Sequence, residues 1–130
     1  MILLDTHIFL WWVVQPDRLT VAQLEAIRNN EGDSLGVSAI TCWEVAKLIQ
    51  LGRIELGRDV GEWLEFALAY PGKKLLPLTP RIAVASTQLP EGFRSDPADE
   101  ILVATARVYN CPLVTSDRKL REYPHVTSVY

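Results

Sequence analysis

The chain has 130 residues, of which 48% are hydrophobic and 22% charged, and this composition predicts a single globular domain over residues 1–130 that buries a core. Its net charge of -3 differs from that of many nucleic-acid-binding domains, which are often basic overall, so an RNA or DNA ligand would require a local basic surface. The two cysteines, Cys42 and Cys111, exclude a disulfide framework and have no partner at zinc-ligand spacing.

The N-terminal half predicts short apolar strands that alternate with helices. The first residues, MILLDTH, lack the basic region of a signal peptide, and the apolar run from Ile8 to Val14 is too short to span a bilayer, so we expect a cytoplasmic protein. Strands are predicted at Ile2 to Leu4 and Leu35 to Ser38. Helices are predicted from Thr6 to Val14, from Thr20 with its capping pair Gln23, from Ala39 to before Gly52, and from Asp59 to before Pro71.

The C-terminal half repeats this alternation. Leu75 to Leu78 is a strand candidate, although Pro77 places it at a strand start or edge. Helices are predicted after Thr79-Pro80, after Asp96-Pro97 and from Asp117, and the last strands at Leu113 to Thr115 and Val126 to Val129. This order predicts an α/β fold with three layers, α/β/α, around a central, mostly parallel sheet of about five short strands.

Four carboxylates are expected at one edge of that sheet. Ligands of open parallel sheets bind beyond the carboxyl ends of the strands. Asp5 directly follows the first strand, Glu44 lies early in the helix after the second, Asp99 is in the first turn of the apolar helix before the fourth, and Asp117 follows that fourth strand. Each residue alone is also explained by the preference of acidic side chains for first helical turns, so only the set of four indicates a site.

The energy of such a cluster indicates a cation. Two unit charges about 5 Å apart repel by about 3 kcal/mol at an effective dielectric of roughly 20. Either the pKa values of the carboxyl groups rise or a cation lies between them. Ligation by oxygen alone suits Mg²⁺ or Mn²⁺ rather than zinc, and these ions activate water and stabilise phosphoryl transition states.

Two other magnesium-binding classes fit less well. A phospho-acceptor receiver domain would have an Asp after the third strand, where this chain has Thr79-Pro80. A haloacid-dehalogenase-like phosphatase would have a second Asp two residues after the first, where His7 stands.

Four blocks of the sequence resemble the PIN-domain nucleases, and most of all the VapC-type toxins of toxin–antitoxin pairs. The blocks are LLDTHIFLWW, SAITCWEVAKLIQLGRIEL, DPADEILVATA and VTSDRKL, and the similarity extends over about residues 2–129. The resemblance implies a Mg²⁺- or Mn²⁺-dependent endoribonuclease that hydrolyses RNA phosphodiester bonds. It also implies a cognate VapB-like antitoxin and a homodimer as the partners of the chain.

The resemblance assigns the metal and the catalysis to an acidic quartet. Asp5 and Asp99 correspond to the principal metal ligands, and Glu44 and Asp117 complete the cluster. Asp96 is the alternative to Asp99 as the metal ligand, but its position is that of the helix cap. Glu100 departs from the family, which often has a basic residue there, so RNA contacts at that position do not carry over.

Other residues are candidates for substrate contacts. Thr6 and Thr115 either orient carboxylates and water or make local caps. Four basic residues border the expected acidic edge and are candidates for phosphate contacts, with a solvated surface as the alternative: Arg94, Arg118, Lys119 and Arg121. Cys42 is expected in the core, as are most of the four tryptophans, of which one or two would serve an interface.

Two alternatives to a toxin remain at this point. One is a housekeeping PIN nuclease of RNA maturation, and the other is a catalytically silent PIN-like module that binds RNA or protein. A silent module would have no reason to retain clustered carboxylates, and a neighbouring antitoxin gene would separate the two nucleases.

Overall fold

The structure is a computed structural model that describes residues 1–32 and 34–130. The first half contains β1 (Ile2–Leu4), α1 (Thr6–Val14), a 3-10 turn (Pro16–Arg18), α2 (Val21–Asn30), β2 (Leu35–Ser38) and α3 (Ala39–Gln50). The second half contains α4 (Val60–Leu68), β3 (Lys73–Leu76), α5 (Pro80–Ser86), a 3-10 turn (Pro90–Gly92), α6 (Pro97–Tyr109), β4 (Leu113–Val114), α7 (Arg118–Glu122) and β5 (Ser128–Val129). Among the described residues, no helix is both long enough and apolar enough to cross a membrane.

The strands form one sheet in the order β3-β2-β1-β4-β5, and each described pair of neighbours is parallel. The chain builds outward from β1 to β2 and β3 on one side and then returns to add β4 and β5 on the other. The strand order therefore reverses between β1 and β4. In open α/β sheets the crevice at such a reversal, beyond the carboxyl ends of the strands, is where ligands bind.

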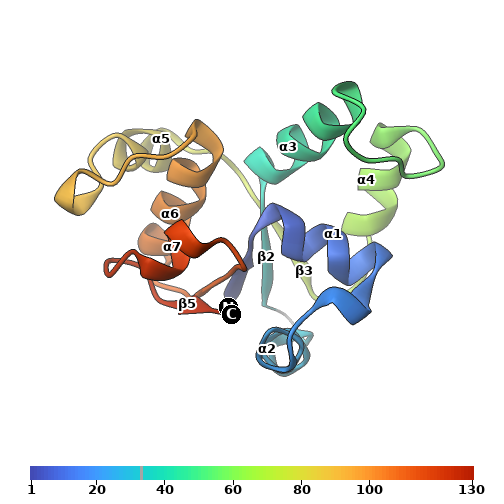
Figure 1. The fold of residues 1–130 in the computed structure, drawn as a ribbon, viewed down its shortest axis with the longest axis horizontal. Coiled ribbons are helices and arrows are strands. Elements are labelled where there is room, and N and C mark those ends of the chain that lie inside the picture. The colour runs from blue at the N-terminus through green and yellow to red at the C-terminus, as the bar shows by residue number, and fades with distance from the viewer. Residues whose placement is uncertain (33) are drawn as a thin grey trace.

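Helices cover both faces of the sheet, with α1 and α4 on one side and α5, α6 and α7 on the other (Figure 1). Alternate side chains of β1 enter two different cores: Ile2 and Leu4 pack with α1, α2 and α4, whereas Leu3 packs with α5, α6 and α7. The three-layer α/β/α prediction is confirmed.

Side-chain caps fix where several helices begin. Thr20 and Gln23 form the reciprocal capping box expected from the sequence. Thr79 and Asp96 each accept the backbone N–H three residues later, from Ile82 and Asp99 respectively. The helix starts read from the sequence are confirmed at these positions.

Three strands differ from their predicted bounds, and the smallest difference is in β4, which ends at Val114 rather than at Thr115. β3 spans Lys73–Leu76 rather than Leu75 to Leu78, because Pro77 cannot donate to the ladder and ends the strand instead of starting it. Within the described part of the chain β3 pairs with β2 alone, and its exposed Lys74 and Leu75 are those of an edge strand. β5 is limited to Ser128–Val129 instead of Val126 to Val129, since a turn occupies the residues before it.

The buried face of α3 also differs from the prediction. Thr41 and Val45 are buried, while Cys42 is half-buried and Trp43 is 55% exposed. Of the tryptophans, Trp63 lies in the core, and Trp11 and Trp12 are half-buried and pack against it, so the expectation that most tryptophans serve the core is confirmed. Trp43 is the tryptophan that fits the expected interface role.

Candidate metal centre

A cleft of about 320 Å³ lies at the strand reversal, and the four predicted carboxylates all line it. The residues around it are Asp5, His7, Trp11, Glu44, Asp96, Asp99, Ser116 and Asp117. They come from the ends of β1 and β4, from α1 and α3, and from the start of α6. The sheet topology therefore brings together residues that are 112 positions apart, from Asp5 to Asp117.

Asp5 is the most buried carboxylate of the cleft, with 8% of its surface exposed. It is the cap of α1, since the Thr6 N–H donates to its Oδ1 at 2.7 Å. Its other oxygen, Oδ2, accepts the hydroxyl proton of Thr115 at 2.7 Å. Both oxygens are thus held in place, and the carboxyl group has a fixed orientation at the end of β1.

Glu44 is positioned through the hydroxyl of Thr6. Thr6 Oγ1 donates to Glu44 Oε1 at 2.5 Å and is 3.1 Å from Thr41 Oγ1. Because the Thr6 proton goes to Glu44, the Thr41 hydroxyl is the donor to Thr6. Thr6 therefore orients Glu44. This is one of the two roles that were considered for Thr6 on the basis of the sequence.

Asp96 and Asp99 have different hydrogen-bonding roles at the start of α6. Asp96 Oδ1 accepts the Asp99 N–H at 3.0 Å, so Asp96 is the helix cap, as predicted. Asp99 is half-buried, and its Oδ2 accepts the hydroxyl proton of Ser95 at 2.6 Å. Both residues line the cleft, and Asp99 is the more buried of the two.

Asp117 is the cap of α7. Its Oδ1 accepts the N–H groups of Lys119 at 2.8 Å and Leu120 at 3.4 Å, and its own N–H donates to Thr115 Oγ1 at 3.0 Å. Thr115 both orients Asp5 and makes a local turn bond, so the two roles considered for it are present together.

The geometry leaves carboxylate oxygens available. Among described residues, no donor reaches Glu44 Oε2, Asp99 Oδ1 or Asp117 Oδ2. These three atoms come from three different elements and border the same cleft. These oxygens are therefore available to accept hydrogen bonds from water or to coordinate a cation.

Burial changes the protonation of the cleft. It raises the pKa of Glu44 to about 7, with Asp5, Asp96 and Asp99 adding to the rise through their negative charge. Burial likewise raises the pKa of Asp99 to about 6, and the neighbouring Asp96, Asp5 and Asp117 add to it. The pKa of Asp5 is raised for the same reason. A cation bound in the cleft would favour the ionised form of these carboxyl groups and lower their pKa values.

The donor set fits a hard divalent cation. All of the acidic ligands offer oxygen, and within residues 1–32 and 34–130 no three acidic, histidine or cysteine side chains converge closely enough to enclose an ion by themselves. Mg²⁺ usually keeps several waters and takes only one or two protein carboxylates, so an open cleft of this kind suits it. A closed zinc site would instead need four protein ligands that surround the ion.

The predicted basic residues lie outside the cleft. Arg118 pairs with Glu122 at 2.9 Å, Arg121 packs 4.1 Å from the centre of the Tyr130 ring, and Lys119 lies 5.7 Å from that of Phe93. Arg94 borders a separate hollow with Phe93 and Glu100. The structure brings the four acidic residues together but does not bring these four cations into the same cavity.

Several supporting residues were missed in the sequence. They hold the carboxylates or the segments that carry them: Thr41, Ser95, Ser116 and the side-chain amide of Gln23. The role of Ser95 could have been inferred from the sequence, because Ser95 stands four residues before Asp99 and beside the helix cap. The long-range contact of Gln23 with Ser116 had no local signal.

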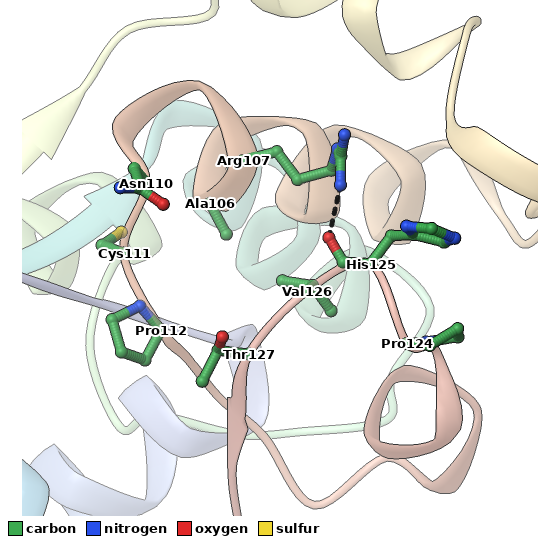
Figure 2. Close-up of a pocket in the computed structure, with 9 residues that line it drawn as sticks. All are labelled: Ala106, Arg107, Asn110, Cys111, Pro112, Pro124, His125, Val126 and Thr127. Atoms are coloured by element: carbon green, nitrogen blue, oxygen red, sulfur yellow. Dashed lines mark hydrogen bonds between the residues drawn. The ribbon is translucent and has the colours of Figure 1, made fainter.

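A second hollow lies at the opposite edge of the sheet, before the start of β4 and β5. Figure 2 shows its walls, where Arg107 donates to the backbone oxygen of His125 at 2.5 Å, with Asn110 and Thr127 among the other lining residues. None of the nine described residues that line it is acidic. It therefore does not compete with the acidic cleft as a metal centre.

Comparison with known proteins agrees with this geometry. The sequence profile of the PIN domain matches residues 2–126. Ribonuclease VapC22 of Mycobacterium tuberculosis is 38% identical over 124 residues, which cover 95% of this chain and 92% of that protein.

Solved structures share the fold at lower identity. FitAcB from Neisseria gonorrhoeae superposes with a TM-score of 0.70 at 21% identity, covering 100% of this chain and 97% of that one. VapBC2 from Rickettsia felis, bound to a DNA fragment from its promoter, superposes with a TM-score of 0.69 at 15% identity, covering 98% and 97%. On the profile match and the 38% identity, this chain belongs to the PIN domain family.

Proposed function

We propose that the chain, as one PIN domain over residues 1–130, is a divalent-metal-dependent endoribonuclease and the toxin of a VapBC-type pair. The observation that supports this proposal is the meeting of Asp5, Glu44, Asp99 and Asp117 around one cleft at the strand reversal. The 38% identity to a protein named Ribonuclease VapC22 supports the same activity.

In this proposal Mg²⁺ or Mn²⁺ binds in the acidic cleft, with Asp5 and Asp99 as the principal ligands. Asp5 is preoriented by Thr115, and Asp99 by Ser95, so neither has to lose much side-chain freedom on binding. When bound there, a divalent cation would supply an activated water and would offset the negative charge that develops on a phosphodiester. Glu44 and Asp117, each with a free oxygen, complete the ligand set or orient the attacking water.

The partners follow from the same proposal. RNA is the substrate, and a VapB-like antitoxin is the regulator, because relatives of the same fold are described as toxin–antitoxin complexes, including one from Klebsiella pneumoniae. The homodimer expected from the resemblance stays a prediction. The proposal also includes RNA contacts outside the cleft. There the phosphates of the bound RNA would meet four basic residues: Arg94, Arg118, Lys119 and Arg121.

RNA cleavage tests the proposal. Total RNA is incubated with the chelator-treated protein, with and without Mg²⁺, and new ends are mapped. Cleavage at discrete sites that requires the metal and is lost in Asp99→Asn is the expected result. Cleavage that persists in excess chelator, or equally in Asp99→Asn, would contradict it.

A further inference from the structure

Gln23 joins the start of α2 to the segment that carries two residues of the cleft. Its side chain is fully buried. Gln23 Oε1 accepts the Thr20 N–H at 2.9 Å, which closes the capping box. Gln23 Nε2 donates to Ser116 Oγ at 2.7 Å and to the backbone oxygen of Thr115 at 3.4 Å, across 93 and 92 positions of sequence.

The segment that Gln23 holds is the one that orients the carboxylates. Thr115 donates its hydroxyl proton to Asp5 Oδ2 and accepts the N–H of Asp117. Ser116 itself lines the cleft between them, and Gln23 is its one side-chain partner among the described residues. A displacement of residues 115–117 would therefore move the donor to Asp5 and the start of α7 together.

The residue type at position 23 has a specific consequence. A capping box accepts Glu as readily as Gln, because only a side-chain oxygen is needed for the N–H of the capping residue. Glu has no N–H, so it could not donate to the Thr115 carbonyl and would set a carboxylate oxygen against it. The bonds to residues 115 and 116 thus use the one group that distinguishes Gln from Glu.

We propose that Gln23 is a positioning residue of the acidic cleft, which holds residues 115–117 and through them the carboxylates of Asp5 and Asp117. This inference rests on the proposed function for its consequence in metal binding, but not for the hydrogen bonds themselves. Groups that orient metal ligands from outside typically change metal affinity by about 10- to 100-fold when they are removed. Gln23 acts through Thr115, so an effect of about tenfold is expected.

The chain offers a matched control at the same helix start. Gln23→Met keeps the length and apolar volume of the side chain and removes all three bonds. Thr20→Ala removes the bond from the Gln23 N–H to Thr20 Oγ1 and weakens the same helix start, but leaves Nε2 with Ser116 and Thr115. Ser116→Ala removes one of the two acceptors, alone and in combination with Gln23→Met.

Two measurements are made on each variant at a temperature where all are folded. Calorimetry without RNA gives the Mn²⁺ affinity, and hydrogen exchange without metal gives the protection of the Asp117 amide, which donates to Thr115. We expect Gln23→Met to weaken Mn²⁺ binding about tenfold and to accelerate exchange at Asp117, and Thr20→Ala to leave both about unchanged. The double variant should lose no more affinity than Gln23→Met, because both changes break the same link.

Equal effects of Gln23→Met and Thr20→Ala would overturn the inference, since Gln23 would then only cap a helix. Additive losses in the double variant would overturn it as well. If the wild type binds no Mn²⁺, the proposed function fails, and the exchange of the Asp117 amide still decides whether Gln23 holds residues 115–117.

Discussion

The hydroxyl of Thr115 lies 2.7 Å from Oδ2 of Asp5, although the two residues are 110 positions apart in the sequence. The same hydroxyl accepts the N–H of Asp117 at 3.0 Å. Thr115 and Asp5 are both buried, at the adjacent ends of β4 and β1. One side chain thus links the carboxylate of Asp5 to the backbone of Asp117 at the strand reversal.

Replacement of Thr115 by Val tests this coupling. Val has nearly the same shape but no hydroxyl, so the buried Asp5 Oδ2 loses its donor, at a cost of about 1 to 3 kcal/mol in the free energy of unfolding. We expect Mn²⁺ affinity to fall about tenfold or more. Thr115→Ser should restore most of the affinity, and a Val variant with wild-type affinity would show that the hydroxyl does not orient the site.

Asp99→Asn separates chemistry from folding. The change removes one charge from a crowded cleft, so the melting temperature without metal should hold or rise, while RNA cleavage falls by roughly 100-fold or more. Asp96→Asn is the matched control, because Asn is as good a cap as Asp and should preserve both properties. If Asp96→Asn abolishes cleavage and Asp99→Asn does not, the ligand has been assigned to the wrong member of the pair.

The raised pKa values predict how stability depends on pH in the presence of chelator. In the folded protein Glu44 has a pKa of about 7 and Asp99 of about 6, against 4.5 and 3.8 for the unperturbed groups. The folded state therefore binds protons more tightly than the unfolded state, and these groups stabilise the fold below about pH 4. Their contribution is lost as the pH rises through about 4 to 7.

Melting curves between pH 4.5 and 7.5 check this prediction. Glu44→Gln and Asp99→Asn should each flatten the decline of the melting temperature toward neutral pH, since each removes one of the titrating groups. Saturating Mn²⁺ should also flatten it at the upper end of the range. A decline of the same steepness in wild type and both variants would contradict the assignment to these residues.

The basic residues near α7 carry a prediction about RNA. Arg118, Lys119 and Arg121 come shortly after Asp117 and lie outside the cleft, and we predict that they contact phosphates beyond the proposed metal centre. Replacement of all three by Ala in the Asp99→Asn background should weaken RNA binding. The log–log slope of affinity against salt should fall by about 0.7 for each lost contact with a single strand.

A second triple variant, which also loses three positive charges, controls for the effect of net charge on RNA binding. It replaces three exposed arginines that line no part of the cleft, Arg28, Arg53 and Arg81. Its salt slope should stay close to that of the wild type. Equal slopes in the two triple variants would mean that the charges near α7 are solvated and that RNA follows another path.

The sequence predicted the features that depend on local rules. The capping box at Thr20 and the cap at Asp96 follow from side chains that bond to backbone three residues away, and both are present. The layered fold follows from the alternation of apolar strands and helices. The placement of Asp5, Glu44, Asp99 and Asp117 in one cleft follows from the rule that parallel strands end at the same edge.

Other features depend on tertiary contacts that no local pattern encodes. The start of β3 at Lys73 is decided by pairing with β2, and the sequence pattern favoured the more apolar residues that follow. Trp43 is exposed because the face of α3 that meets the core carries Thr41 and Val45. The links from Gln23 to Ser116 and from Thr115 to Asp5 join residues more than 90 positions apart, so only the folded chain reveals them.

Melting of the chelator-treated protein against Mn²⁺ concentration tests the central claim most directly. An ion that binds only the folded state stabilises it by about 2.7 kcal/mol at one hundred times its dissociation constant, which raises the melting temperature of a domain of this size by several degrees. We predict this rise in the wild type, a similar rise with Mg²⁺, and a much smaller one in Asp99→Asn. A wild-type melting temperature that millimolar Mn²⁺ leaves unchanged would contradict a metal centre in the acidic cleft.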